Sequence, residues 1–289
     1  MKVSMDYYTF ISRDKWSLWW YLNECDEMNL DGAHIPDCDV TYPHELFTSH
    51  RCRAEWKYQP LPEETVLKIR DFCDERKWEK VLSGWGGPYA SERTEDCLYL
   101  TQANLETASL LGAKVMRIVP SGYRDDPRRF KIEWAVRNLK RAAELAKSYD
   151  IVLGLETHAV ISGASDIIEI IDRVDSDYLG VTLDTGNITT SSAEDPNVPP
   201  LKAIETLAPK IVATHIRDVT YDRAARAWRC VPCGEGIVDF KAIASILKDA
   251  DYNGTLALEF INNNLNRAKE DLEKVKPIIR SCVEYLRKL

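Results

Sequence analysis

Short apolar runs alternate along the chain with longer segments in which apolar side chains recur every three or four residues. The short runs are rich in Val, Ile and Leu, which is typical of parallel strands that are buried on both faces. The predicted strands are residues 2–9, 32–35, 80–83, 114–120, 151–157, 178–185, 211–218 and 254–260. The longer segments are typical of amphipathic helices that pack on a sheet. The predicted helices are residues 63–77, 94–111, 132–148, 164–174, 200–207, 239–249 and 265–289.

Strands and helices in alternation, about eight of each, predict an α/β protein built as a single (β/α)8 TIM barrel. Because the composition shows no break, we expect one domain over residues 1–289, and a doubly wound sheet is the alternative. Residues 37–60 match none of the predicted elements and include His44 and His50. The length of this segment is compatible with a lid over the barrel mouth.

Charge and composition exclude several classes of protein. The 289 residues carry a formal net charge of -8, and the isoelectric point is about 5.3. An acidic protein repels a phosphate backbone, so nucleic acid is not an expected partner. The apolar stretches are too short for a membrane span, and the N-terminal MKVSMDYYTF lacks the apolar core of a signal peptide. The eight scattered cysteines, Cys230 and Cys233 among them, are therefore expected to be reduced thiols in a cytoplasmic protein.

Four polar side chains each stand at the C-terminal end of an apolar run in the second half of the chain. They are Glu156 in IVLGLET, Asp184 in YLGVTLDT, His215 in IVATHIRD and Glu259 in GTLALEF. The first two gaps, of about 30 residues, each match one strand-plus-helix unit, and the last gap, of about 44 residues, leaves room for an extra loop. Singly, Glu156 is compatible with an ion pair, Asp184 with a strand-end turn and His215 with a core histidine.

Taken together, these four residues predict a metal site. Neighbouring strands of a parallel barrel present their C-terminal ends to one mouth, so the four side chains are expected to converge there. Carboxylates packed together raise one another's pKa values unless a cation lies among them. Oxygen donors with one neutral imidazole suit Mn²⁺, Mg²⁺ or Co²⁺ better than a thiolate-preferring metal. The pattern therefore indicates a metal-dependent enzyme that acts on a small polar substrate.

Five motifs resemble a known family: LGLETH, GVTLDTGN, ATHIRDV, CGEGIVDF and LALEF, in this order. They look like the sugar phosphate isomerase/epimerase family of the xylose isomerase-like TIM barrel superfamily, and residues 100–262 carry the resemblance. The resemblance implies a divalent metal, Mn²⁺ first with Mg²⁺, Co²⁺ or Zn²⁺ as alternatives, held by Glu156, Asp184, His215 and Glu259. It also implies an isomerase or epimerase of a keto-sugar or related polyol derivative. In such an enzyme Glu156 and Glu259 move protons through a cis-enediolate that the metal stabilises.

Two departures from the family pattern leave a second reaction open. Asn187 stands where many epimerases have a histidine, and we expect it to contact the substrate. His158 lies two residues after Glu156 and faces the same way on the strand, so it is either a catalytic acid or base or a residue that orients a ligand. The alternative activity is a metal-dependent lyase or dehydratase that acts beside a ketone, including the C-glycoside-cleaving type.

Three further residues are candidate contacts for a small carbohydrate substrate. Arg217 shares a strand face with His215, Trp85 ends the third predicted strand, and Glu235 lies in a GEG turn ahead of a helix. The aromatic residues near Trp19 are compatible with a homo-oligomer. An endonuclease-like phosphodiesterase requires more histidines and a basic face, and a non-catalytic barrel does not require four ligands, so both are less consistent with the chain.

Overall fold

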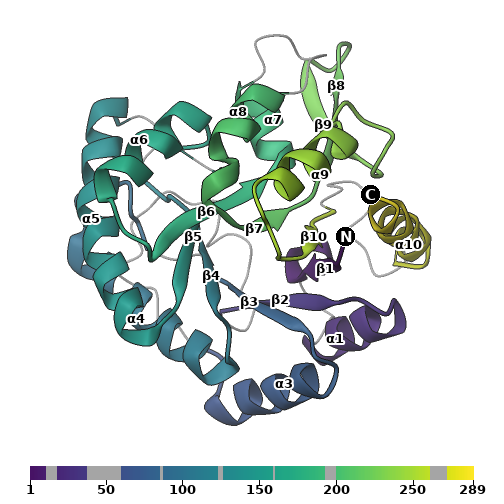
Figure 1. The fold of residues 1–289 in the computed structure, drawn as a ribbon, viewed down its shortest axis with the longest axis horizontal. Helices are drawn as coiled ribbons and strands as arrows, with labels where there is room; N and C mark the ends of the chain where they lie inside the picture. The colour runs from purple at the N-terminus through teal and green to yellow at the C-terminus, as the bar shows by residue number, and fades with distance from the viewer. Residues whose placement is uncertain are drawn as a thin grey trace.

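Eight parallel strands form a barrel in the computed structural model, with helices around the outside (Figure 1). The structure describes residues 1–10, 18–37, 60–84, 87–122, 126–158, 160–192, 200–260 and 272–289. Within these residues the strand order is β10-β1-β2-β3-β4-β5-β6-β7. The bounds are β1 Val3–Asp6, β2 Gly32–Pro36, β3 Glu79–Ser83, β4 Val115–Ile118, β5 Val152–Glu156, β6 Leu179–Asp184, β7 Ile211–His215 and β10 Leu256–Leu258. The (β/α)8 barrel predicted from the apolar runs is confirmed.

The barrel closes where β10 meets the end of β7. Ile216 forms an isolated parallel bridge with Leu258. The amide of Ile216 donates to the carbonyl of Ala257 at 2.7 Å, and the amide of Glu259 donates to the carbonyl of Ile216 at 3.0 Å. Because this seam lies at the C-terminal ends of both strands, it brings His215 and Glu259 to the same mouth of the barrel.

The helices lie outside the strands, as the helical periodicity predicts (Figure 1). The bounds are α1 Leu18–Glu27, α3 Glu63–Glu75, α4 Thr94–Leu111, α5 Arg128–Tyr149, α6 Ala164–Val174, α7 Thr185–Ser192, α8 Leu201–Leu207, α9 Phe240–Asp249 and α10 Leu272–Arg287. The predictions for α4 and α6 match the observed bounds. α5 begins at Arg128 rather than at residue 132, because Pro127 supplies a fixed backbone angle directly ahead of the first turn.

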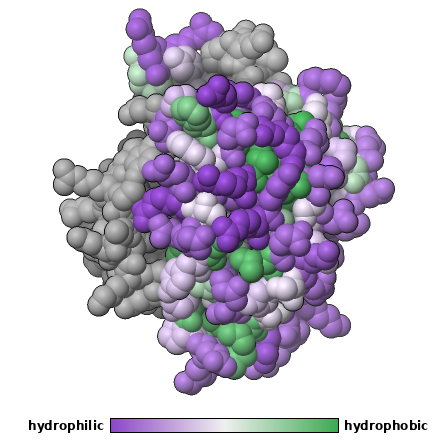
Figure 2. All heavy atoms as spheres, turned by 90° about the vertical axis from the view of Figure 1, so that its left-hand side faces the viewer, coloured by the Kyte–Doolittle hydropathy of each residue, from purple (hydrophilic) through white to green (hydrophobic). Residues whose placement is uncertain are grey.

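Apolar side chains fill the space between the strands and the helices. In α6 the buried residues are Ile167, Ile170, Ile171 and Val174, which share one face of the helix. The outer face that carries α4, α5 and α6 is mostly hydrophilic, with apolar side chains in small separate groups (Figure 2). No helix of the described residues is both long and apolar enough to cross a membrane.

A hairpin that the sequence pattern did not predict follows β7. Strand β8 (Asp218–Asp222) pairs antiparallel with β9 (Ala227–Val231). The predicted strand over residues 211–218 therefore divides, because the chain leaves the barrel after His215. The carboxylate of Asp218 accepts hydrogen bonds from the amides of Gly234 at 2.8 Å and Gly236 at 2.9 Å, and so holds the turn after the hairpin. The hairpin accounts for the long gap between His215 and Glu259.

Candidate metal centre

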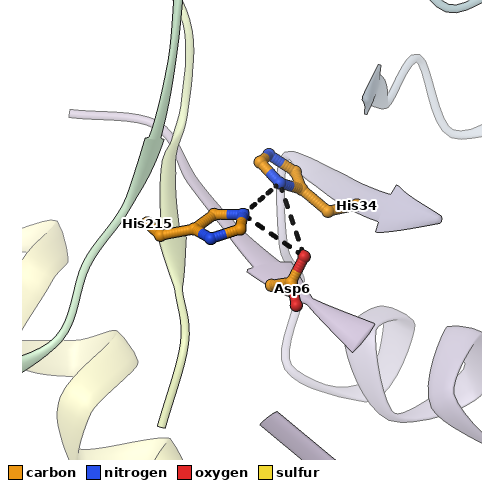
Figure 3. A group of neighbouring side chains, drawn as sticks. All are labelled: Asp6, His34 and His215. Carbon is orange, nitrogen blue, oxygen red and sulfur yellow. Dashed lines mark hydrogen bonds and ion pairs between the residues drawn. The ribbon is translucent and has the colours of Figure 1, made fainter. Parts of the chain in front are cut away.

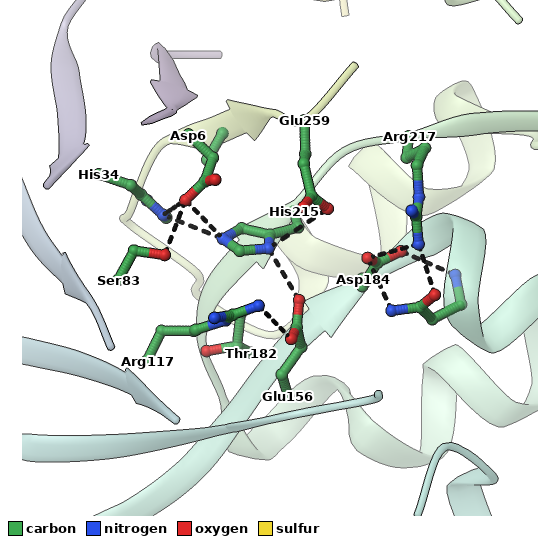
Figure 4. A network of polar contacts seen from close by, with 12 residues as sticks. Asp6, His34, Ser83, Arg117, Glu156, Thr182, Asp184, His215, Arg217 and Glu259 are labelled. Carbon is green, nitrogen blue, oxygen red and sulfur yellow. Dashed lines mark hydrogen bonds and ion pairs between the residues drawn. The ribbon is translucent and has the colours of Figure 1, made fainter. Parts of the chain in front are cut away.

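Four strand ends bring four polar side chains together at the C-terminal mouth of the barrel (Figure 4). Together they form the carboxylate–histidine cluster, which consists of Glu156 at the end of β5, Asp184 at the end of β6, His215 at the end of β7 and Glu259 just after β10. Each offers one ligand atom, these atoms all lie within 4.8 Å of one another, and all four residues are buried. The barrel thus collects the side chains that the sequence analysis singled out as candidate metal ligands.

Backbone pairing explains why these side chains meet. Asp184 and His215 are register partners across β6 and β7. The amide of Asp184 donates to Thr157 Oγ1 at 3.0 Å, which joins the ends of β6 and β5. Neighbouring parallel strands in register point equivalent side chains in the same direction, so the cluster follows from the pairing and not from any single loop.

The centre of the cluster is Nδ1 of His215. It lies 2.8 Å from Glu156 Oε1 and 3.6 Å from Glu259 Oε2. Glu259 Oε2 is buried and has no hydrogen-bond donor among the described residues. A buried carboxylate oxygen without a donor is costly, and a coordinated cation removes that cost. This orphaned oxygen, in a set of three carboxylates and one imidazole, fits a divalent cation.

Two arginines pair with the cluster, Arg117 buried and Arg217 partly buried. Arg117 on β4 donates from Nη2 to Glu156 Oε2 at 2.6 Å, and Arg217 donates from Nη2 to Asp184 Oδ2 at 2.9 Å. Arg217 Nη2 also donates to Asn187 Oδ1, in a short contact. The sequence analysis missed Arg117, although a lone arginine in the apolar strand VMRI was a usable signal.

A second layer lies behind His215 and comes from the first three strands (Figure 3). His215 Nε2 lies 3.3 Å from Asp6 Oδ2 and 3.2 Å from His34 Nδ1. Ser83 Oγ donates to Asp6 Oδ2 at 2.8 Å. The sequence analysis missed Asp6, His34 and Ser83. His34 and Ser83 stand at or near the end of a predicted strand, so the rule that identified the carboxylate–histidine cluster also applies to them. Asp6 lies in the middle of the predicted strand 2–9, and only the structure, in which β1 ends at Asp6, places it at a strand end.

Burial and close charges move the pKa values of the cluster in different directions. Burial is the largest effect on Asp184 and raises its pKa to about 7, with Arg217 opposing and Glu259 adding to the rise. Burial also opposes the charge of Glu156, but the Arg117 guanidinium and the neighbouring imidazoles outweigh it and lower the pKa to about 2.

His215 of the cluster and His34 of the second layer differ in charge. Burial opposes the charge of His215, but the carboxylates of Asp6 and Glu259 outweigh it and raise the pKa of His215 well above its usual value. Burial and the charge of His215 lower the pKa of His34 to about 3. His34 is therefore neutral at neutral pH.

The charges of the site leave room for one divalent cation. Four buried carboxylates (Asp6, Glu156, Asp184 and Glu259) and two guanidinium groups (Arg117 and Arg217) lie in or against the cluster, and Asp37 is a further buried carboxylate directly after β2. With neutral histidines, the six groups in or against the cluster sum to two negative charges, which one divalent cation balances. In the protein without a metal, the pKa values of Asp184 and His215 are raised, so each of these two side chains tends to hold a proton within the cluster. The cation and the two protons are therefore alternative ways to neutralise the site.

The remaining residues that the sequence analysis proposed as catalytic or substrate-binding differ in how they relate to the cluster. The amide of Asn187 in α7 donates to Asp184 Oδ1 at 2.7 Å, and its Nδ2 donates to Asp184 Oδ2 at 2.9 Å. The pKa of His158 is lowered, first by burial, and the charge of Glu156 opposes the change. Glu235 has an exposed side chain in the turn after β9. Trp85 and residues 38–59 lie outside the described residues.

A family model and several known proteins match the chain. The model of the family described as xylose isomerase-like TIM barrel matches residues 45–282. A 3-oxo-isoapionate decarboxylase from Pectobacterium atrosepticum is 30% identical over 113 residues, which are 37% of this chain and 38% of that protein. An uncharacterized protein from Methanocaldococcus jannaschii is 27% identical over 154 residues, which are 51% of this chain and 48% of that protein. The chain therefore spans less than half the length of the curated relatives that it matches.

Two solved structures are similar over the whole chain. The IolI protein with a bound zinc atom has a TM-score of 0.74 and 17% identity, with 99% of each chain covered. A D-psicose 3-epimerase from Clostridium cellulolyticum H10, solved with D-tagatose, has a TM-score of 0.74 and 14% identity, with 100% of this chain and 99% of that chain covered. At these identities the similarity shows a common fold.

Proposed function

This chain belongs to the xylose isomerase-like TIM barrel family, and on that premise we propose that it is a divalent-metal-dependent isomerase or epimerase of a keto-sugar or related polyol derivative. The observation that carries the proposal is the carboxylate–histidine cluster, in which Glu259 Oε2 has no hydrogen-bond donor among the described residues. The zinc in the IolI protein and the ketose in the epimerase structure support it. The proposed ligands are the four residues of the cluster, and Mn²⁺ is the first choice of metal.

The chemistry that we propose is a proton transfer next to a ketone. A divalent cation in the cluster supplies positive charge that polarises the ketone and the neighbouring hydroxyl. One of the two glutamates, Glu156 and Glu259, removes the proton from the adjacent carbon, and the other returns a proton to the resulting enediolate. Both pKa values lie below their usual range in the protein alone, so both side chains are ionised and can accept a proton.

We propose that Arg217, Asn187 and His158 complete the substrate site. Arg217 and Asn187 lie against Asp184, so a substrate oxygen at that ligand would be within their reach. His158 is neutral at neutral pH because its pKa is lowered, so it can accept a proton without first losing one. Glu235 and Trp85 remain proposed substrate contacts from the sequence alone.

Deuterium exchange tests the proposal directly. Protein loaded with Mn²⁺ is incubated with a panel of free keto-sugars in D₂O, alongside Glu259→Gln and a control variant, Glu24→Gln. Glu24 is also a buried carboxylate, but it pairs with Lys276 between α1 and α10. We expect deuterium at the carbon next to the carbonyl with the native protein and with Glu24→Gln, and none with Glu259→Gln. An absence of exchange across the panel, in protein that does bind Mn²⁺, contradicts the proposed reaction.

A second candidate is a metal-dependent lyase that cleaves a bond beside a ketone. The match to a decarboxylase favours it, as does Asn187 in place of the histidine of many epimerases. Its test is mass spectrometry of the same incubations, extended to 3-oxo sugar acids. A product lighter by carbon dioxide or water, with no exchanged starting material, would replace the isomerase proposal with the lyase.

A further inference from the structure

The side of His215 that faces away from the carboxylate–histidine cluster contacts two residues from β1 and β2 (Figure 3). Nε2 lies 3.3 Å from Asp6 Oδ2 and 3.2 Å from His34 Nδ1. Asp6 and His34 are register partners on β1 and β2, and both side chains are buried. The hydroxyl of Tyr21 lies 2.5 Å from the carbonyl of Met5 and 3.2 Å from that of His34, which ties β1 and β2 to α1. The pair is therefore held by strands and a helix, not by a loop.

The chemistry of these two residues decides where His215 carries its proton. A carboxylate only accepts hydrogen bonds, and Ser83 Oγ donates to the same oxygen, Asp6 Oδ2, at 2.8 Å. His34 Nδ1 is 3.7 Å from Asp6 Oδ2, too far to donate to it, and lies 3.2 Å from His215 Nε2. With its proton on Nε2, His34 offers the Nδ1 lone pair to His215 as a second acceptor beside Asp6. A lone pair on His215 Nε2 would face the two acceptors Asp6 Oδ2 and His34 Nδ1 without a hydrogen between them. An N–H on Nε2 can donate to either acceptor, so the proton is favoured at this position.

We propose that Asp6 and His34 are positioning residues that hold the proton on Nε2 of His215, so that Nδ1 presents its lone pair to the cation. This inference rests on the proposed metal site, and it adds that Asp6 and His34 raise the affinity of that site for the metal ion. Neither Asp6 nor His34 is a proposed metal ligand or substrate contact. Partners of this kind behind a ligating histidine set its tautomer and its ring orientation. Here they connect β1 and β2 to a cluster that is built from β5, β6, β7 and β10.

The test begins with Asp6→Asn, which keeps the shape but replaces one acceptor oxygen with a donating amide. If the amide oxygen faces His215, it is a weaker acceptor than the carboxylate, and if the amide N–H faces His215, it favours the proton on Nδ1. In both orientations the proton is held less firmly on Nε2, and a proton on Nδ1 blocks the ligand position. We expect Mn²⁺ affinity to fall by about 10- to 100-fold. Ser83→Ala removes a hydrogen bond to Asp6 but leaves the acceptors of His215 in place, so we expect a smaller loss. Glu24→Gln controls for the loss of a buried carboxylate elsewhere, and we expect its affinity to equal that of the native protein.

A spectroscopic measurement separates positioning from simple stability. In the native protein loaded with Zn²⁺, nitrogen–proton correlation spectra of the histidine rings should show His215 protonated at Nε2 and bare at Nδ1. The melting temperature in a chelator reports folding for each variant, and the spectrum of the native protein remains decisive if Asp6→Asn does not fold. Unchanged Mn²⁺ affinity in Asp6→Asn, or a zinc-loaded His215 without a proton on Nε2, overturns the positioning role alone. A native protein that binds neither metal overturns the proposed metal site, and this inference with it.

Discussion

Arg117 reaches from β4 to Glu156 at the end of β5, where Nη2 donates to Oε2 at 2.6 Å. Both side chains are almost completely buried, at 3% and 0% exposure. The pair occupies one oxygen of Glu156, and the other, Oε1, faces His215 Nδ1 at 2.8 Å. A cation in the cluster therefore has Oε1 of Glu156 available, while Oε2 is held by the arginine. The guanidinium of Arg117 is thus a permanent positive charge next to the proposed metal ion.

Replacement of Arg117 with Met should destabilise the protein when no metal is bound. It leaves the buried carboxylate of Glu156 without its partner, which costs about 3–5 kcal/mol. Saturating Mn²⁺ should recover part of this loss, because the metal supplies a positive charge beside the same carboxylate. Urea unfolding in a chelator and in Mn²⁺ measures both effects. Arg173→Met is the control, because Arg173 pairs with Glu133 at the surface. Equal losses in chelator and in Mn²⁺ would show that Glu156 does not ligate the metal.

Replacement of Glu259 with Gln, or of His215 with Ala, should abolish the stabilisation by Mn²⁺. Free Mn²⁺ at about 100 times its dissociation constant should stabilise the native protein by about 2.7 kcal/mol. At the same concentration the two variants should show little gain, because each lacks one ligand of the cluster. Thermal unfolding and metal analysis after purification without chelator give the measurement. Glu235→Gln, an exposed glutamate outside the cluster, should behave like the native protein. Full metal content in Glu259→Gln would rule out that residue as a ligand.

Metal affinity should fall as the pH falls, and more steeply below pH about 7. Burial raises the pKa of Asp184 to about 7, so below that pH a proton occupies this carboxylate and competes with the cation. The pKa of His215 is also raised, by Asp6 and Glu259 acting against burial, so its Nδ1 proton must leave over the whole range. We expect about a tenfold loss per pH unit above pH 7 and about a hundredfold loss per unit below it. Calorimetric titration with Mn²⁺ in two buffers of different ionisation enthalpy counts the released protons. A flat profile between pH 6 and 8 would contradict the proton competition.

Replacement of Gly186 with Ala should destabilise the protein through Arg217. A Cβ at this position would lie 2.5 Å from Arg217 Nε, in α7 directly after Asp184. Overpacking of this kind costs about 1–3 kcal/mol, which exceeds the roughly 0.5–1 kcal/mol that Ala gains over Gly in a helix. Urea unfolding measures the change, and the same substitution in an Arg217→Ala background serves as the control. In that background only the 3.3 Å approach to Cβ of residue 217 remains, so the loss should become much smaller or reverse in sign. An equal loss in both backgrounds would place the strain elsewhere.

Periodicity along the chain was sufficient for the order of strands and helices in the barrel, and it placed most strand ends to within about two residues. Buried strands and amphipathic helices repeat on scales of two and 3.6 residues, so a window of about ten residues contains the signal. The bounds of α4 and α6 follow from that signal alone. The four residues of the carboxylate–histidine cluster were recognisable for the same reason, since each ends a run of apolar residues.

Local periodicity did not predict where the chain departs from the repeat. α7 starts at Thr185 immediately after β6, because the carboxylate of Asp184 accepts from the amide of Asn187 and so satisfies a free N–H of the first turn. The hairpin of β8 and β9 depends on Asp218, which accepts from amides 16 and 18 residues away. Side chains that satisfy distant backbone groups leave no periodic trace in the sequence.

The sequence by itself determined the order of the strands and that three carboxylates and one histidine of the second half lie at neighbouring strand ends. Only the tertiary structure decided that Asp6, His34 and Arg117 of the first half meet them there. Periodicity reports which face of a strand is buried, but contact between strands distant in the chain depends on the closure of the barrel. The seam between Ile216 and Leu258 makes that closure, and it brings the beginning of the chain to the back of His215.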